Sequence, residues 1–378
     1  MLFQKLKQRL LKAYMSSLSK PKVEGRTLFD LSRVKSIGLW QFGGVGDMLL
    51  ITPVIDALAV ACPQAKIHLW CSEPAFAEFL SGFPNVEAIH KLNIYDFDAR
   101  TLASAEKRRE LCQLRDEVQG LKLDLLINLH IPALIDWWAV SWWLISRSGS
   151  RFSIGFDPEV MQSESVYDVS LPASERDGVH YLSLYQTLLS RVGVSSGVTT
   201  RFPVSDESRE KAQALLKSVG VSDVQAWVCL HAGARRLAMI GKQWPAASFA
   251  KLATELQTMG IRTLLIGVDS EQSLADEIRR LAPGTLSLLG QTDLIVMAAV
   301  IARARLFIGQ DSGPFHVAVA QGVPSIALCG REDAEAHYLA YDRKNVHALI
   351  RPDPTQISVI DVMQQALPYL PASKREEP

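Results

Sequence analysis

The sequence predicts an α/β protein made of two Rossmann-like domains, whose parallel sheets face a central cleft. The first observation is the run Gly43-Gly44-Val45-Gly46-Asp47, which stands between a strand pattern and a helical pattern. The second is the run Asp311-Ser312-Gly313-Pro314, which stands between the same kinds of pattern. The third is the alternation of strand and helix patterns in both halves of the chain, which is typical of parallel sheets. Such junctions can hold phosphate, because a helix start presents N–H groups without partners in the helix.

Apolar runs and helical periodicity define the elements of the first domain. We predict strands at 34–40, 66–71, 86–90, 123–129 and 152–155. Helices are predicted at 47–60, 73–81, 101–119, 132–146 and 178–193. A stretch rich in Ser, Gly, Thr and Pro follows at 195–206 and predicts the domain boundary. The expected division is an N-terminal extension at 1–30, a first domain at 31–200 and a second domain at 201–378.

The second domain repeats the alternation after a leading helix at 206–218. Strands are predicted at 225–230, 261–266, 285–288, 305–309 and 324–329, and helices at 246–259, 270–281, 293–303, 314–321 and 355–367. Lys and Arg together number 40, as do Asp and Glu, so the chain lacks the basic field of a nucleic-acid-binding protein. The five cysteines form no C-x-x-C pair, which predicts reduced thiols of a cytosolic protein without metal or disulfide roles.

The N-terminal 20 residues place Leu6, Leu10 and Tyr14 at helical spacing, with Lys and Arg between them. This pattern predicts a basic amphipathic helix, which can lie on an anionic membrane or pack on the protein's own body. The run Trp137–Trp143 leaves two similar alternatives. Its tryptophans suit a membrane–water interface that a lipid-linked acceptor would approach, or a helix buried between the sheet and a partner subunit. No signal peptide and no spanning stretch of about 20 apolar residues is evident.

The first glycine run supplies a carboxylate, Asp47, whose plain structural role would be to cap the following helix. A dinucleotide fingerprint is disfavoured because Leu49 occupies its third small position, although Glu73 follows the second strand. The P-loop signature Gly-Lys-Ser/Thr is absent. The run therefore predicts close approach of a ligand to the backbone and leaves the role of Asp47 open.

The second junction predicts a phosphate site more strongly. Ser312 and Gly313 offer N–H groups at a helix start, and His316 follows on the same turn. A third piece is the loop after 225–230, where His231 and Gly233 leave room for a ligand and Lys242 can supply a positive charge. A helix-face histidine and a solvated surface lysine are the corresponding structural alternatives.

The sequence Asp96-Phe97-Asp98 spells a D-x-D, a pattern that binds divalent metal in some glycosyltransferases. It precedes a helix and lies away from both glycine junctions, so we interpret it as a solvated turn and helix cap.

Together, the Gly43–Pro53 run, the His231–Pro245 loop and Asp311–Gly313 with His316 resemble the lipopolysaccharide heptosyltransferases, which are family 9 glycosyltransferases of the GT-B fold. The resemblance implies metal-independent, inverting transfer of a heptose from ADP-heptose to a lipopolysaccharide core or other lipid-linked acceptor, without a cofactor. It implies that the first domain binds the acceptor and that the second binds the donor. It also implies a cytoplasmic enzyme, peripheral on the inner face of the inner membrane.

The same resemblance assigns roles to individual residues. Asp47 would be the general base. This role agrees with the chemistry, because the acceptor hydroxyl must lose its proton as it attacks the anomeric carbon. The donor and its phosphates would be bound by Gly44, Gly46, His231, Gly233, Lys242, Asp311, Ser312, Gly313 and His316. Asp269 or Glu271 would meet the ribose. Two alternatives remain: a nucleotide-sugar epimerase of the same shape, and a non-catalytic, membrane-docked protein that binds nucleotide diphosphates.

Overall fold

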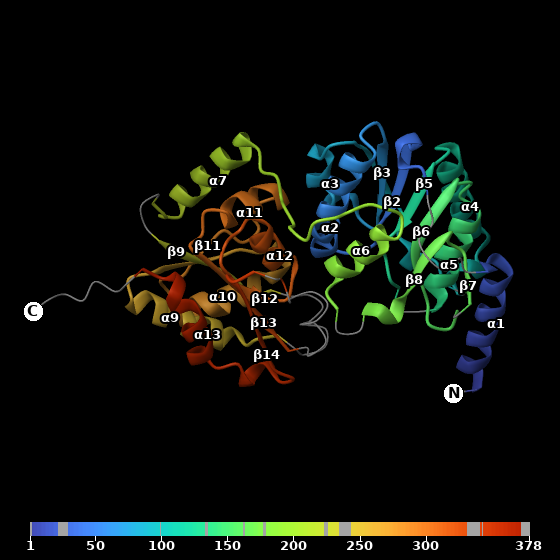
Figure 1. The fold of residues 1–378 in the computed structure, drawn as a ribbon. Coiled ribbons are helices and arrows are strands. Elements are labelled where there is room, and N and C mark those ends of the chain that lie inside the picture. Colours follow the sequence, from blue (N-terminus) through green and yellow to red (C-terminus); the bar gives the residue numbers. More distant parts are fainter. Residues whose placement is uncertain are drawn as a thin grey trace, which may run out of the picture. The chain divides into compact units, whose positions relative to one another are not determined.

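A computed structural model of the chain describes residues 2–21, 29–98, 100–132, 135–161, 163–176, 179–222, 226–233, 243–330, 341 and 343–371. It divides into two compact units, Met1–Thr199 and Thr200–Pro378 (Figure 1). Each unit contains one six-stranded sheet in which every neighbouring pair of strands is parallel. The predicted α/β class with two Rossmann-like sheets is therefore confirmed.

The sheet of the first unit has the order β4-β3-β2-β5-β6-β8. Its strands are β2 (Ser36–Trp40), β3 (Lys66–Cys71), β4 (Val86–Lys91), β5 (Leu125–Asn128), β6 (Phe152–Asp157) and β8 (Val169–Pro172). The helices around it are α2 (Val45–Leu50), α3 (Thr52–Ala61), α4 (Ala105–Gly120), α5 (Ile135–Ser146) and α6 (Tyr181–Ser190). The central strands β2 and β5 are almost entirely buried, which explains their continuous apolar pattern.

The sheet of the second unit has the order β11-β10-β9-β12-β13-β14. Its strands are β9 (Trp227–His231), β10 (Arg262–Leu265), β11 (Leu286–Ser287), β12 (Leu306–Gln310), β13 (Ser325–Cys329) and β14 (Val346–Ile350). Its helices are α7 (Asp206–Ser218), α9 (Ala246–Thr258), α10 (Gln272–Leu281), α11 (Leu294–Ile301), α12 (Gly313–Ala320) and α13 (Val359–Ala366). In chain order both sheets read 3-2-1-4-5-6, the doubly wound arrangement in which ligands bind where the strand order reverses.

Three sequence predictions for the elements were wrong or incomplete. The segment predicted as a helix at 73–81 forms two short 3₁₀ turns, Pro74–Phe76 and Glu78–Gly82. The predicted helix 47–60 is broken at Ile51, so that α2 and α3 are separate. The sixth strand of each sheet, β8 or β14, was not predicted. Both are edge strands, and β14 is only half-buried, so their sequences carry a weaker apolar signal.

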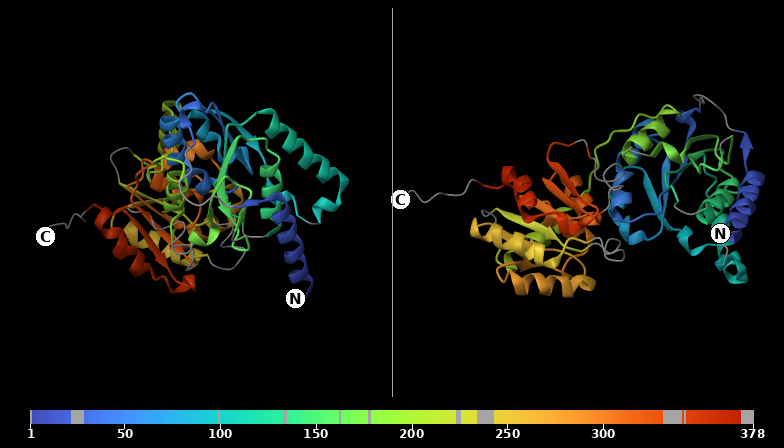
Figure 2. Two further views of the ribbon diagram at one scale, coloured as in Figure 1. Left: turned by 45° about the vertical axis from the view of Figure 1, so that its right-hand side comes forward. Right: turned by 90° about the horizontal axis from the view of Figure 1, so that it is seen from below.

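The N-terminal helix α1 (Leu2–Leu18) packs against α5 of its own unit (Figure 2). Met15 is completely buried in this contact, and the Ser16 hydroxyl donates to the Glu164 carboxylate at 2.5 Å. A two-residue strand, β1 (Lys20–Pro21), then pairs with β7 (Glu164–Ser165). Packing on the protein's own body is thus the alternative that α1 adopts. Among the described residues, no helix combines the length and apolar character needed to cross a membrane.

Helix α5 is mainly a core helix. Trp138 and Trp142 are buried, while Trp137 and Trp143 are half-buried. Trp137 meets the ring of Tyr95 edge-on, with 4.6 Å between the ring centres. The buried tryptophans favour the buried alternative for this segment over a membrane interface.

Candidate active site

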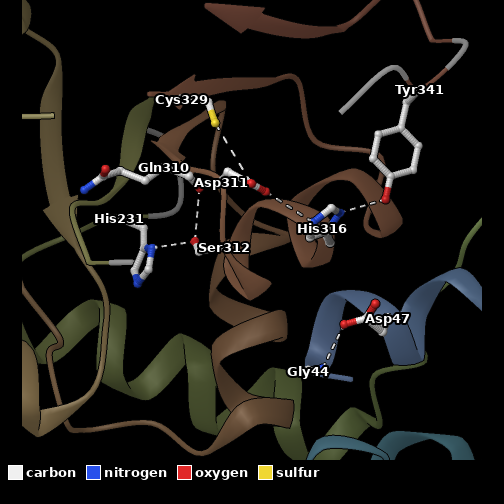
Figure 3. Close-up of polar contacts among 9 residues, drawn as sticks. All are labelled: Gly44, Asp47, His231, Gln310, Asp311, Ser312, His316, Cys329 and Tyr341. Atoms are coloured by element: carbon white, nitrogen blue, oxygen red, sulfur yellow. Dashed lines mark hydrogen bonds and ion pairs between the residues drawn. The ribbon is translucent and has the colours of Figure 1, made fainter. Parts of the chain in front are cut away.

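In the second unit, the carboxyl ends of β9 and β12 lie side by side where the strand order reverses. Gly309 is in register with His231, so the residues that follow each strand emerge at the same edge. The His231 Nδ1 atom lies 3.0 Å from the Ser312 hydroxyl oxygen (Figure 3). Ser312 begins α12, whose second residue, Pro314, suits the first turn of a helix. The structure thus brings together two of the predicted phosphate-site residues.

Glu271 joins this cluster from the turn after β10. Its Oε2 atom lies 3.4 Å from His231 Nε2 and accepts the Val268 N–H at 3.2 Å. Burial alone would raise the pKa of Glu271, but the hydrogen bond and charge of His231 and the Val268 N–H bring it below the ordinary value. A Cβ atom on Gly233 would collide with the Glu271 carboxylate. The glycine therefore leaves the space that this carboxylate occupies. The cluster therefore keeps a charged carboxylate at the sheet edge.

Asp311 and His316 form a second pair on the same edge. The Asp311 Oδ1 atom lies 3.9 Å from His316 Nε2, and His316 Nδ1 lies 2.8 Å from the Tyr341 hydroxyl. The Cys329 thiol lies 4.0 Å from the other Asp311 oxygen. Only 12% of the Asp311 side chain and 6% of the His316 side chain are exposed. His316 is therefore held in one orientation by partners on both ring nitrogens.

Gln310 was missed by sequence reasoning, although it orders this edge. Its side chain is completely buried. Its amide nitrogen donates to the Ala232 carbonyl, and its amide oxygen accepts the backbone N–H of Trp244 at 3.0 Å. It thereby holds residues on both sides of the segment 234–242. The predicted phosphate ligand Lys242 belongs to that segment and lies outside the described residues. The available signal for Gln310 was a polar residue at the end of an apolar strand pattern.

In the first unit, the glycine loop follows β2 and leads into α2. Gly44 is the residue that caps α2, and Asp47 is the third residue of the helix. The Asp47 Oδ2 atom accepts the Gly44 N–H at 2.9 Å (Figure 3). Asp47 is therefore the reciprocal acidic residue of a helix start, rather than the cap that the structural alternative assumed. A Cβ atom on Gly43 would collide with the Asp47 side chain, whereas Gly44 has open space.

A neutral network holds the residue before this loop. The Tyr95 hydroxyl donates to the Phe42 carbonyl at 2.9 Å, and the Phe42 N–H donates to the Gln41 amide oxygen at 3.1 Å. His130, which follows β5, reaches Gln41 Oε1 at 3.2 Å and Tyr95 Oη at 2.9 Å. Burial lowers the pKa of His130 to about 3, so the ring is neutral near pH 7. Sequence reasoning missed all four residues of this network.

The sequence profile of glycosyltransferase family 9 (heptosyltransferase) matches residues 134–361, more than half of the chain. The chain belongs to glycosyltransferase family 9. The predicted family and enzyme class are thus confirmed.

Curated relatives of this family 9 glycosyltransferase are heptosyltransferases. Lipopolysaccharide heptosyltransferase 3 of Escherichia coli is 29% identical over 295 residues, which cover 76% of this chain and 81% of the relative. Lipooligosaccharide heptosyltransferase 2 of Haemophilus influenzae is 36% identical over 94 residues, which cover 24% of this chain and 27% of the relative.

Solved structures show that the fold is GT-B. A family 9 glycosyl transferase from Veillonella parvula has a TM-score of 0.74 at 21% identity, covering 90% of this chain and 98% of that one. An Escherichia coli heptosyltransferase solved with ADP has a TM-score of 0.65 at 21% identity, covering 89% and 100%. A UDP-GlcNAc 2-epimerase from Methanocaldococcus jannaschii also aligns, with a TM-score of 0.51 at 11% identity, covering 87% of this chain and 92% of that one. The fold alone therefore does not separate transferases from epimerases, and the family assignment rests on sequence.

Two other sequence predictions concern carboxylates of the family 9 glycosyltransferase. Asp269 lies against Gly290, where a Cβ atom would collide with its carboxylate, whereas Glu271 reaches His231. Asp98 accepts the N–H groups of Arg100 and Thr101 at 2.8 and 2.7 Å, so the turn predicted for the D-x-D sequence is present. The predicted helix cap is wrong, because the residue that caps α4 is Ser104. The described residues contain no group of three or more His, Cys, Asp or Glu side chains that could hold a metal ion.

Proposed function

We propose that this family 9 glycosyltransferase transfers a heptose from ADP-heptose to a lipopolysaccharide core or other lipid-linked saccharide, with inversion and without a metal. The cluster of His231, Ser312 and Glu271 at the switch point of the second sheet carries the proposal. It combines a helix start, which favours phosphate, with a carboxylate that can accept hydrogen bonds from sugar hydroxyls. The relatives include lipopolysaccharide heptosyltransferase 3 and a heptosyltransferase solved with ADP, which supports the choice of donor.

In this proposal Asp47 is the general base. The acceptor hydroxyl oxygen attacks the anomeric carbon, and Asp47 accepts the hydroxyl proton as that bond forms. The bond between the anomeric carbon and the diphosphate oxygen breaks, and ADP leaves with the electron pair. A single displacement of this kind inverts the anomeric centre. The N–H of Gly44 supports the anionic form of Asp47, because it already donates to the carboxylate.

The leaving diphosphate is assigned to the second unit. The N–H groups of Ser312 and Gly313 at the start of α12 and the charge of Lys242 would stabilise it without a metal ion. Asp311 and His316 line the nucleotide part of the same edge. Gly46 and Gly233 are assigned to close backbone approach in the two loops. Residues 31–200 would thus form the acceptor domain and residues 201–378 the donor domain.

We assign the ribose hydroxyl contacts to Glu271 rather than Asp269. Glu271 lies 3.4 Å from His231 and is therefore part of the switch-point cluster, whereas Asp269 lies against Gly290. The reaction is assigned to the cytoplasmic face of the membrane, where a peripheral enzyme would meet a lipid-linked acceptor. Neither a cofactor nor a metal takes part in the proposed steps.

The first test measures thermal stability with ADP, UDP, GDP and CMP at equal, high concentration. A nucleotide at about 100 times its Kd should stabilise the protein by roughly 2.7 kcal/mol, and we expect this from ADP alone. Transfer is then measured with ADP-heptose and a heptose-deficient lipopolysaccharide. Incorporation of heptose that requires the acceptor supports the proposal. Conversion of ADP-heptose without an acceptor would establish the epimerase alternative, and nucleotide binding without turnover would establish the non-catalytic one.

A further inference from the structure

A cavity of about 290 Å³ lies among α1, α4 and α5 of the first unit and shares no residue with the candidate active site. Helix α5 lines it with Asp136, Ala139, Val140 and Trp143. These positions are spaced by three and four residues, so they form one continuous stripe on the helix. The stripe is apolar except for the carboxylate at its N-terminal end.

The other two helices complete the walls with mostly apolar side chains. Helix α4 contributes Leu111 and Cys112, and α1 contributes Leu11 and Tyr14. Tyr14 is 41% exposed, so the wall that α1 contributes reaches the surface. Pockets with this apolar character and a few polar groups are typical of sites for small or chain-like ligands.

Three arginines lie at or near the cavity. Arg108 lines it, and the guanidinium groups of Arg115 and Arg147 lie 5.9 and 5.2 Å from the centre of the Trp143 ring. Arg115 also pairs with the Asp116 carboxylate at 2.7 Å. Burial raises the pKa of Tyr14, and the positive charge of Arg147 opposes this rise. Arg147 is therefore close enough to α1 to act on Tyr14. Because the whole chain carries no net charge, this concentration of guanidinium groups is local.

Two carboxylates also line the cavity, and their surroundings differ from those of the arginines. Asp98 accepts backbone N–H groups of Arg100 and Thr101 and thereby caps a turn. Asp136 belongs to the first turn of α5, where a negative charge is favoured, and is 9% exposed. Both carboxylates therefore have structural roles, whereas Arg108 and Arg147 have exposed side chains.

The outer surface of α1 has the character of an interfacial helix. Leu10 is 64% exposed on the surface, with Arg9 and Lys12 exposed beside it. Exposed leucine and tyrosine next to basic side chains suit contact with the headgroup region of an anionic membrane. A soluble anion would use the arginines alone and would leave the apolar cavity without a role.

We propose that this cavity takes up one alkyl chain of an anionic lipid, while the arginines around Trp143 receive the phosphate of its headgroup. The apolar stripes match the chain, and the guanidinium groups match the phosphate. The lipid would hold α1 and α5 at a membrane surface. This inference goes beyond the proposed sugar transfer, and its test does not measure transfer.

Cys112 provides a direct test in the full-length protein. It is half-buried in the cavity wall, whereas the other four cysteines, which are also free thiols, are buried. We would measure the rate at which N-ethylmaleimide alkylates Cys112, by peptide mass spectrometry, with lysophosphatidylglycerol below its critical micelle concentration. At about ten times the Kd, occupancy should slow alkylation roughly tenfold, because only an empty cavity exposes the thiol.

Two ligands separate the parts of the proposal. Glycerol 3-phosphate carries the anionic group without the chain and should leave the alkylation rate unchanged. 1-Monolauroylglycerol carries an acyl chain without the phosphate and should protect only at higher concentration. No protection by lysophosphatidylglycerol would overturn the proposal, as would equal protection by glycerol 3-phosphate. Equal protection by lysophosphatidylglycerol and 1-monolauroylglycerol would overturn the part assigned to the arginines.

Matched variants locate the headgroup contact. Arg147→Gln removes a guanidinium beside Trp143, whereas Arg109→Gln removes one from α4 that does not line the cavity. The first variant should raise the protective concentration of lysophosphatidylglycerol several-fold, and the second should not. Sedimentation with phosphatidylcholine vesicles containing phosphatidylglycerol should show the same difference. Identical behaviour of both variants in both measurements would contradict the proposed headgroup site.

Discussion

The two sheets have the same strand order, yet their switch points are chemically different. In the first unit, β2 and β5 are followed by Gln41 and His130, which belong to a neutral hydrogen-bonded network. In the second unit, β9 and β12 end in His231 and Gln310, and a charged carboxylate, Glu271, joins them. One scaffold thus supports a rigid, neutral anchor in one unit and a charged cluster at a helix start in the other.

Under the proposed function, the difference would divide the work between the two units. A base that takes a proton needs an exact position relative to the attacking oxygen, and the neutral network would fix the loop that carries Asp47. A nucleotide diphosphate needs N–H groups and charge, which the second switch point would supply. The fold brings strand ends together in both units, whereas the side chains decide which chemistry follows.

The largest effect is expected at Asp47. In Asp47→Asn the amide cannot accept the acceptor proton, so kcat should fall by about 10²- to 10⁴-fold, while ADP affinity stays unchanged. Steady-state transfer assays and calorimetric ADP titration measure the two quantities. Asp206→Asn is the control, because it makes the same change in the first turn of α7, where the carboxylate is 91% exposed. Normal turnover in Asp47→Asn would exclude Asp47 as the base.

A smaller but still large effect is expected at the glycine that makes room for Asp47. In Gly43→Ala the new methyl group would collide with the Asp47 side chain and displace it, whereas in Gly44→Ala it would enter open space. A displacement of about 1 Å can cost roughly 10²-fold in rate, so Gly43→Ala should lose kcat and Gly44→Ala should keep most of it. The ADP affinity of Gly43→Ala should match the wild type, because the new methyl group acts on Asp47. Equal kcat values would show that the Asp47 position is not critical.

The second switch point should respond in affinity rather than in rate. Glu271→Gln removes a charge-assisted hydrogen bond, a loss of about 1.5–3 kcal/mol that corresponds to roughly a ten- to 100-fold weaker ADP complex. Asp269→Asn is the matched control and should change the Kd little. Calorimetric titration with ADP measures both. If Asp269→Asn weakened ADP binding and Glu271→Gln did not, the ribose assignment would have to be reversed.

The sequence was sufficient to predict the central strands and both glycine junctions. Buried parallel strands have continuous apolar runs, and the junctions contain Gly and Pro at turn positions, so both signals are local. The edge strands β8 and β14 lack the continuous burial that produces such an apolar run. The packing of α1 on α5 could not be predicted, because an amphipathic helix has the same sequence pattern whether it covers a protein or a membrane.

Choices that depend on side-chain direction were also beyond the sequence. Asp269 and Glu271 lie in one 3₁₀ turn, two residues apart, yet only Glu271 reaches His231. Gln41, Tyr95 and His130 are far apart in the chain, and only the parallel pairing of β2 with β5 brings their strand ends together. Such networks have no local sequence signature, because each partner is supplied by a different element.

The smallest predicted effect separates the two units by their response to acid. Burial holds the pKa of His130 near 3, so the unfolded chain binds a proton below its ordinary pKa of 6.5 while the folded chain does not. The stability of the first unit should therefore fall as the pH drops from 6.5 toward 3, by at most about 1.4 kcal/mol per pH unit from this residue. His68 and His90, whose pKa values are also lowered by burial, add to the trend.

Glu271, in the second unit, acts at lower pH, because its lowered pKa removes stability only as the pH falls below 4.5. Hydrogen exchange between pH 7 and 5 should thus show β2 and β5 losing protection before β9 and β12. His130→Gln should reduce that loss, and equal loss in both units would contradict the assignment of a neutral histidine at this position.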